Sequence, residues 1–206
     1  MYPTAEVRWF AEGPLPEAVE AWFHAAAGER PWEARTDRYV RPASPDGLGV
    51  KARSGYLEVK RLAEVVGEEE LHDGVTGRVE CWRKWSFPLG AGATLRDVTG
   101  DWVAVAKRRR KGTFAVRNGT VEIVQREEQA GQGCSLEIAE VEADGQTWWS
   151  VGFEAFGTYD QAALVEYLRR AAAHVFAAAD PPALPAAQAM SYPAWLCALS
   201  KDGKQV

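Results

Sequence analysis

The sequence of 206 residues has few cysteines: Cys81, Cys134 and Cys197 lie far apart in the chain. An odd number without C-x-x-C spacing argues against a disulfide framework and a zinc ribbon, and it is typical of a reducing cytosol. No apolar run approaches the roughly 20 residues that a membrane span needs. The N-terminus also lacks the pattern of a signal peptide. We therefore expect a cytoplasmic protein with no membrane partner.

Common catalytic and nucleotide-binding motifs are also absent from the sequence. It contains no G-x-S-x-G, no Walker A sequence and no G-x-G-x-x-G before a helix. Basic residues are fewer than acidic ones, 24 against 29, and the net charge is −5. A general nucleic-acid surface is therefore not expected. Any site for an anion has to be a local cluster of positive charge.

Strand patterns dominate the first three quarters of the chain. Alternation of apolar and polar residues predicts strands over 6–10, 35–41, 50–65, 76–87 and 101–111. Asn118-Gly119 and Asp144-Gly145 predict two further hairpins. We expect a turn over 44–47, a loop over 68–74 and a glycine-rich connection that leads to Thr99. The pattern indicates about eight antiparallel strands in a meander.

Helical spacing predicts three helices: one over 14–28, a long one over 159–179 and a short one that starts at Ser191. The length fits a single domain over 1–206, with strands within about 4–156 and C-terminal helices within about 159–200. The predicted fold class is α+β: an eight-stranded antiparallel β-barrel or tunnel with flanking helices.

Two-residue turns fix strand register, so the faces of each hairpin can be worked out. At Ser54-Gly55, Lys51 lies opposite Glu58, and Lys60 follows on the same face. The other two hairpins are sorted in the same way. Arg117 lies on the charged face of the Asn118-Gly119 hairpin, and Glu137 and Glu154 lie on the charged face of the Asp144-Gly145 hairpin. Two interpretations are open. The charged face belongs to a half-buried sheet that meets water, or it lines the inside of a closed barrel.

An inward charged face would have a chemical consequence. Uncompensated buried charges cost several kcal/mol, so an interior rich in Lys and Arg would favour a polyanion. Interior carboxylates would favour a divalent metal.

Short motifs in a fixed order resemble one known family. They are Glu6 on the first strand, Asp37 and Tyr39 in RTDRYV, Lys51 and Arg53 in GVKAR, Lys60 in LEVK, Arg78 and Glu80 in GRVECW, Lys107 and Arg109, Glu154 in GFEAF, and the tail SYPAWL. This set is similar to the CYTH family, the triphosphate tunnel metalloenzymes. The resemblance implies an eight-stranded tunnel that binds, and usually hydrolyses, triphosphates with Mg²⁺ or Mn²⁺.

The sequence departs from that family where acidic residues are expected in pairs. Arg8 and Phe10 stand where the first strand of the family has a second acid and a lysine. Trp82 replaces the second acid of GRVECW, and GFEAF keeps only Glu154. A metal-dependent hydrolase needs carboxylates to hold its metal against phosphate oxygens. These departures weaken the expectation of hydrolysis more than that of anion binding.

The resemblance and the strand faces together imply a site. The expected phosphate-binding residues are Arg8, Lys51, Arg53, Lys60, Arg78, Lys84, Lys107, Arg109 and Arg117. The expected ligands of Mg²⁺ or Mn²⁺ are Glu6, Glu80, Glu137 and Glu154. No catalytic residue is assigned.

The implied function is binding of a small anionic ligand: a triphosphate, a nucleotide or a polyphosphate. Metal-dependent hydrolysis, as in a triphosphatase, and a non-catalytic binding or scaffolding role with a degenerate metal site are both open. A homodimer is left open as well.

Overall fold

A computed structural model describes residues 1–45, 47–90 and 101–202 of the chain. Its elements, in chain order, are β1 (Tyr2–Glu12), α1 (Glu17–Ala27), β2 (Glu33–Val40), β3 (Leu48–Arg53), β4 (Tyr56–His72), β5 (Val75–Pro88), β6 (Trp102–Arg117), β7 (Thr120–Val124), α2 (Glu127–Ala130), β8 (Gly133–Ala143), β9 (Gln146–Phe156), α3 (Gln161–Ala178), the 3₁₀ helix η2 (Ala186–Gln188) and α4 (Tyr192–Asp202). In this part of the chain no helix is both long and apolar enough to cross a membrane.

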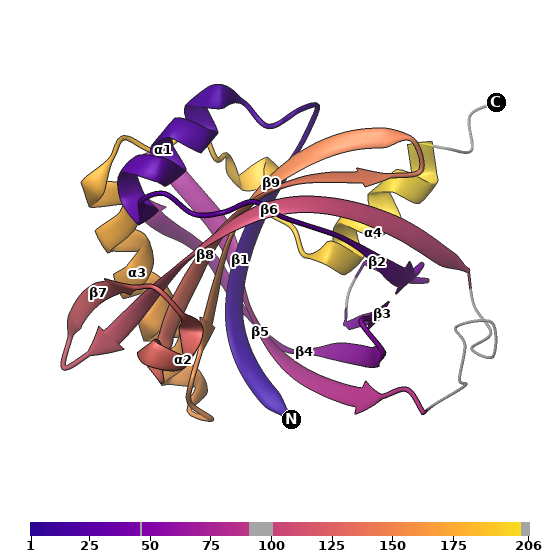
Figure 1. Ribbon diagram of the computed structural model, residues 1–206, viewed down its shortest axis with the longest axis horizontal. Helices are drawn as coiled ribbons and strands as arrows, with labels where there is room; N and C mark the ends of the chain where they lie inside the picture. The colour runs from indigo at the N-terminus through magenta and orange to yellow at the C-terminus, as the bar shows by residue number, and fades with distance from the viewer. Residues whose placement is uncertain (46, 91–100, 203–206) are drawn as a thin grey trace.

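The strands form a closed antiparallel barrel, which confirms the predicted fold class. Their order is β2-β3-β4-β5-β1-β9-β8-β6, and β6 pairs with β2 to close the ring. β7 pairs with β6 outside this ring. Figure 1 shows the long strands wrapping around the centre of the molecule, with helices on its flanks. Of the two interpretations of the charged faces, the closed barrel is the correct one.

Three tight turns set the register of the barrel. Ser54, Asn118 and Asp144 adopt φ of 49°, 49° and 51°, and each is followed by a glycine with positive φ. Two successive residues with positive φ are the geometry that matches the twist of a two-residue hairpin. The predicted registers are observed, with Lys51 opposite Glu58, Val116 opposite Val121 and Ile138 opposite Val151.

Two of the sequence-based boundaries are wrong. The predicted loop over 68–74 is strand instead, because β4 continues to His72 and pairs with β5 through three irregularities in register. The segments predicted as a strand over 101–111 and a separate hairpin arm form the single strand β6. The predicted turn over 44–47 includes residue 46, and the glycine-rich connection includes 91–99; both lie outside the described residues.

The larger hydrophobic core lies between the outside of the barrel and two helices. α1 and α3 cover β1, β8 and β9, and their buried residues include Phe23, Leu168 and Val175. Figure 1 shows the two helices on the same side of the barrel. Each such side chain contributes about 1.5–3 kcal/mol through burial. Packing is close: a Cβ added at Gly77 would lie 2.5 Å from the Trp9 ring.

The second core lies inside the barrel and fills one of its ends. Trp195, Leu196 and Leu199 of α4 are at most 2% exposed and pack with apolar residues from the inner faces of the strands. The Trp195 ring stacks on Phe10 with centroids 4.9 Å apart. Just before α4, the Met190 N–H donates to the carbonyl oxygen of Arg8. α4 is therefore fixed to β1 as it crosses the barrel end.

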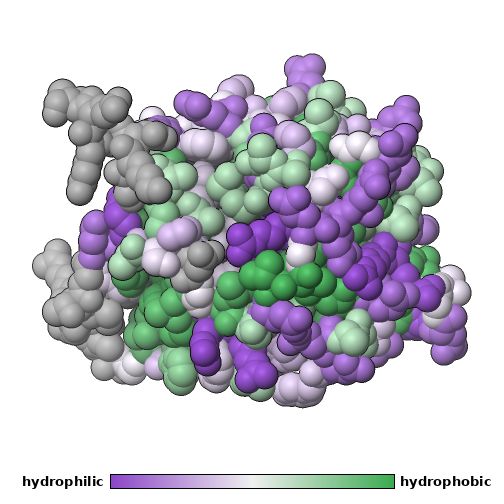
Figure 2. Space-filling view, turned by 180° about the vertical axis from the view of Figure 1, so that it is seen from behind, coloured by the Kyte–Doolittle hydropathy of each residue, from purple (hydrophilic) through white to green (hydrophobic). Residues whose placement is uncertain are grey.

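The outside of β3, β4 and β5 carries apolar side chains in rows across the strands. Val50, Val59 and Trp85 are direct neighbours in one row, and Leu57 lies beside Phe87 in the next. Phe87 is 50% exposed. Figure 2 shows a band of hydrophobic surface on the face turned away from the viewer of Figure 1. The barrel thus keeps its charged face inside and exposes part of its apolar face.

Candidate functional site

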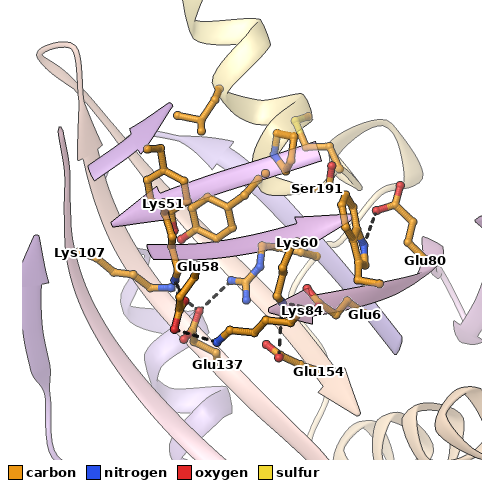
Figure 3. A pocket seen from close by; sticks show the side chains of 18 of the residues that line it. Glu6, Lys51, Glu58, Lys60, Glu80, Lys84, Lys107, Glu137, Glu154 and Ser191 are labelled. Atoms are coloured by element: carbon orange, nitrogen blue, oxygen red, sulfur yellow. Dashed lines mark hydrogen bonds and ion pairs between the residues drawn. The ribbon is translucent and has the colours of Figure 1, made fainter. Parts of the chain in front are cut away.

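The inner faces of the strands enclose a cavity of about 380 Å³, the barrel cavity. Ten basic and five acidic side chains line it, an excess of five positive charges in a chain whose net charge is −5. Strand alternation explains this sorting, because residues two apart on one strand face the same side. Figure 3 shows charged side chains from several strands converging on the cavity.

Twelve of the thirteen residues that the sequence predicts for the site line this cavity. They are Arg8, Lys51, Arg53, Lys60, Arg78, Lys84, Lys107, Arg109, Glu6, Glu80, Glu137 and Glu154. Arg117 does not line it. Its side chain is 50% exposed and pairs with Glu122 at 3.5 Å on the β6–β7 hairpin. Arg117 has the parity of Lys107, but β6 extends past the closed barrel, so the same face meets solvent there.

Glu137 of β8 is the centre of the most buried charge cluster. Its carboxylate oxygens lie 2.6 Å from Lys107 Nζ, 2.8 Å from Arg109 Nη1 and 2.9 Å from Arg8 Nη1. Burial alone would raise the pKa of Glu137, but the three cations outweigh it and hold the pKa well below its ordinary value. Glu137 is therefore a carboxylate enclosed by three cations.

The surroundings of Lys107 disfavour its charged form, whereas those of Glu137 favour the charged form. Burial lowers the pKa of its ammonium to about 8, and Arg8 and Arg35 nearby add to this effect, although Glu137 opposes it. A buried cation crowded by other cations is costly, and a further negative charge beside Lys107 would offset that cost.

Arg8 is positioned by the neighbouring strand β9. Gly152 is its direct cross-strand partner, and a Cβ there would lie 2.6 Å from the guanidinium carbon Cζ. The guanidinium therefore lies flat against the backbone of β9. Arg8 Nη1 also donates to Ser150 Oγ at 3.1 Å. Only glycine at 152 leaves room for this arrangement.

A second carboxylate, Glu58 of β4, also collects three cations. Lys84 Nζ lies 3.0 Å away, Lys51 Nζ 3.2 Å and Arg53 Nη2 3.9 Å. Burial would raise the pKa of Glu58, but Lys51 and Lys84 outweigh it and lower the pKa to about 2. Lys51 is shared, since it also lies 3.4 Å from the buried Asp37. Figure 3 shows Lys84 reaching toward Glu58 across the cavity.

Three glutamates form a row across β5, β1 and β9. Glu6 is the direct cross-strand partner of both Glu80 and Glu154. Like charges opposite one another are destabilising, and cations offset this here. Lys60 Nζ pairs with Glu6 and lies 3.5 Å from Glu154, and Arg78 lies 2.9 Å from Glu80.

This row bears on the predicted metal site. In residues 1–45, 47–90 and 101–202, no three His, Cys, Asp or Glu side chains are arranged to hold a metal ion. The Lys60 ammonium stands between Glu6 and Glu154, where a divalent cation bound to both would have to lie. Glu137, the fourth predicted metal ligand, is enclosed by three cations. As arranged, these carboxylates do not fit a divalent metal.

Aromatic rings form the floor of the cavity beside α4. Tyr192 stacks on Tyr39 with centroids 5.5 Å apart. Both Arg8 and Lys107 lie 5.2 Å from the centre of the Tyr192 ring. Burial raises the pKa of Tyr192 to about 12. The hydroxyl is buried and has no hydrogen-bond partner in the described part of the chain.

Several cavity residues were missed by the sequence prediction: Arg35, Glu58, Lys111 and Tyr192 all line the cavity. For Glu58 and Lys111 a signal existed, because each shares strand parity with a predicted site residue, and Arg35 shares the parity of Asp37 and Tyr39 in the motif RTDRYV. Tyr192 lies on a helix that enters the barrel from outside, so no strand pattern could place it.

The sequence comparisons do not identify a family. No family model matches the chain, and no curated protein matches it either.

Proposed function

We propose that the barrel cavity binds a small anionic ligand that carries a triphosphate or short polyphosphate chain. The observation that carries this proposal is the charge of the lining, ten basic side chains against five acidic ones. Phosphate oxygens accept charge-assisted hydrogen bonds from Lys and Arg, and the fork of Arg suits them geometrically. A polyanion would offset the repulsion among these cations, and so it fits the cavity better than a neutral or cationic ligand.

The cations also have a suitable arrangement. Lys107 and Arg8 gather around Glu137, and Lys51 and Lys84 gather around Glu58, so positive groups occur at successive positions along the cavity. A chain of phosphates offers several anionic groups that can contact these cations together. The resemblance to the CYTH family supports the same ligand class. With the carboxylates engaged by cations, we propose binding without catalysis as the main role.

Metal-dependent hydrolysis is the second candidate. The row of Glu80, Glu6 and Glu154 favours it, because three carboxylates side by side are the kind of oxygen donors that Mg²⁺ and Mn²⁺ prefer. It requires Lys60 to leave the carboxylates, for example to contact a bound phosphate. The test is phosphate release from tripolyphosphate, nucleoside triphosphates and thiamine triphosphate with each metal. Release that depends on Mg²⁺ or Mn²⁺ and is lost in Glu6→Gln supports the hydrolase.

The binding proposal is tested by thermal unfolding with tripolyphosphate at constant ionic strength. A ligand that binds only the folded chain raises the melting temperature, and salt should erode the gain. The expected shift is present in wild type and in Arg117→Gln, a surface control, and reduced in Lys84→Gln. No shift at millimolar tripolyphosphate, with or without metal, contradicts the proposal.

A further inference from the structure

One part of the outer surface of the barrel is apolar and lies outside both hydrophobic cores. α1 and α3 cover the outer faces of β1, β8 and β9. Among the residues that the structure describes, the outward side chains of β3, of the start of β4 and of the end of β5 pack in neither core. The larger ones are Leu48, Val50, Leu57, Val59, Trp85 and Phe87, and we call these six the apolar wall. Leu48 and Phe87 are each 50% exposed, and the other four are partly exposed.

Three arginines stand at the edges of the apolar wall and point outward with it: Arg38, Arg61 and Arg83. All three are exposed, and none of their side chains has an ion pair or a hydrogen bond with a residue that the structure describes. Arg61 and Arg83 are also direct cross-strand partners. Like charges in that position destabilise a sheet, so a carboxylate bound beside them would offset an existing cost.

These strand segments supply no carboxylate to the outer face. In β3, in β4 as far as Arg61 and in β5 from Arg83 onward, the only acidic residue is Glu58, and it lines the barrel cavity. A two-fold dimer brings the same patch of two copies together. A dimer formed through the apolar wall would therefore gather six arginines and no acid from these segments. Charge thus disfavours a second copy of this chain and favours an acidic partner.

The arrangement of the side chains favours a protein partner over a lipid surface. The central apolar residues Val50, Val59 and Trp85 are partly buried, whereas the longer arginines around them are exposed. A membrane-bound face places its apolar side chains about 5–10 Å into the boundary between headgroups and acyl chains. An apolar centre with aromatic residues, and with arginines at its rim, is instead the anatomy of a protein interface.

We propose that the apolar wall and its three arginines bind an acidic amphipathic helix of another protein. α1 and α3 already pack on the outer surface of this barrel, so a helix is an element that suits the wall (Figure 1). The apolar residues of the bound helix, spaced i, i+3, i+4 and i+7, lie over Val59 and Trp85. Carboxylates beside that stripe pair with Arg61 and Arg83. The site lies on the outside of the strands, separate from the barrel cavity, and goes beyond the proposed function.

The probe is a displayed library of helical peptides of about 18 residues, or about five turns. The library is first depleted on the variant Arg61→Glu/Arg83→Glu/Phe87→Thr and then selected on wild type. We expect the enriched peptides to carry an apolar stripe flanked by Asp and Glu. Enrichment of basic or uncharged peptides, or no enrichment beyond that on the depleting variant, overturns the proposal.

Charge exchange tests the role of the arginines. An enriched acidic peptide, measured by fluorescence anisotropy, should bind Arg61→Glu/Arg83→Glu at least about tenfold more weakly than wild type. The same peptide with Lys in place of its acidic residues should bind that variant better than it binds wild type. Arg117→Glu reverses an exposed arginine on the β6–β7 hairpin and is the matched control, with affinity unchanged. Equal affinities of wild type and the double variant overturn the proposal.

Other occupants of the apolar wall give distinct results. If light scattering shows a wild-type dimer that Phe87→Thr converts to a monomer, the wall binds a second copy. If wild type co-sediments with phosphatidylserine vesicles and Arg61→Glu/Arg83→Glu does not, the wall binds a lipid surface. If tripolyphosphate displaces the acidic peptide, the peptide occupies the barrel cavity. Each of these results overturns the proposal.

The apolar wall also has to be open in the protein alone. Leu48→Thr and Phe87→Thr replace exposed side chains with one that suits a strand, so each should change the melting temperature by no more than about 2 °C. A clearly larger fall shows that the chain itself covers these side chains in solution, and it overturns the proposal. Tripolyphosphate binding should be the same in both variants as in wild type, because neither residue lines the barrel cavity.

Discussion

The Arg8 guanidinium lies 2.9 Å from the carboxylate of Glu137, and both side chains are nearly buried inside the barrel. Lys107 and Arg109 contact the same carboxylate. Glu137 thus occupies the centre of three cations, the position that a phosphate oxygen would take. Glu137 pairs with these cations, and under the proposed function it would compete with an incoming anion.

Glu137→Gln is therefore expected to have opposite effects on stability and on binding. Breaking a buried ion pair by removing one partner costs about 3–5 kcal/mol, so the free energy of unfolding should fall by roughly this amount. Affinity for tripolyphosphate should rise, by about tenfold, because the cations lose their internal competitor. Chemical denaturation and calorimetry check the two effects. Glu122→Gln on the surface is the matched control, and weaker binding in Glu137→Gln would contradict the competing role.

Gly152→Ala should displace Arg8. The added Cβ would lie 2.6 Å from the guanidinium carbon, so stability should fall by about 1–3 kcal/mol through overpacking. A double-mutant cycle identifies the cause, because contacting residues are not additive. In an Arg8→Ala background the same Gly152→Ala change should cost much less. If Gly152→Ala lowers stability equally in both backgrounds, the added methyl group does not clash with Arg8.

Lys107 should make anion binding sensitive to alkaline pH. Burial lowers its pKa to about 8 from an ordinary value of 10.5. As the pH rises through about 8, Lys107 loses its charge in the free protein, so tripolyphosphate affinity should decline between about pH 7 and 9. Lys107→Gln should flatten this decline. A wild-type affinity that is constant over this range would contradict the assignment.

The same shift has the opposite sign for stability. Between about pH 8 and 10.5 the unfolded chain binds the Lys107 proton and the folded chain does not, so this residue's contribution to the free energy of unfolding increases with pH. Its contribution is unfavourable below that window. Urea unfolding at several pH values checks this. As the pH rises from about 8 to 10.5, the free energy of unfolding of wild type should increase relative to that of Lys107→Gln.

Tripolyphosphate binding should not require a metal. The carboxylates that the sequence offers as metal ligands are held by Lys60, Arg78 and the cations around Glu137. The dissociation constant should therefore be the same after treatment with a chelator as in the presence of Mn²⁺. Binding that is lost with the chelator and restored by Mn²⁺ would favour the metal-dependent candidate.

The sorting of charged and apolar side chains onto opposite faces could be predicted because its causes are local. Turns such as Ser54-Gly55 fix register by backbone geometry, and register fixes the side on which Lys51 and Glu58 point. Closure into a barrel does not follow from alternation alone, since a half-buried open sheet has the same pattern. The family resemblance implies a closed barrel, and the strand pairing shows that the barrel is closed.

Other features depend on long-range packing. Arg117 has the correct parity, but parity does not say where β6 leaves the barrel. Residues Glu68–Glu70 do not alternate between apolar and polar side chains, yet they belong to a strand because they pair with β5. The entry of α4 and Tyr192 into the barrel depends on fitting Trp195 against Phe10, which no local pattern specifies.

The most direct test of the central claim, that the inner cations form an anion site, is calorimetric titration of tripolyphosphate into wild type, Lys107→Gln and Arg117→Gln. Losing a charged hydrogen-bond partner costs about 1.5–3 kcal/mol, so Lys107→Gln should bind at least about tenfold more weakly. Arg117→Gln should bind like wild type, because Arg117 lies outside the cavity. Equal affinities of all three proteins, or no heat of binding in wild type, would contradict the account.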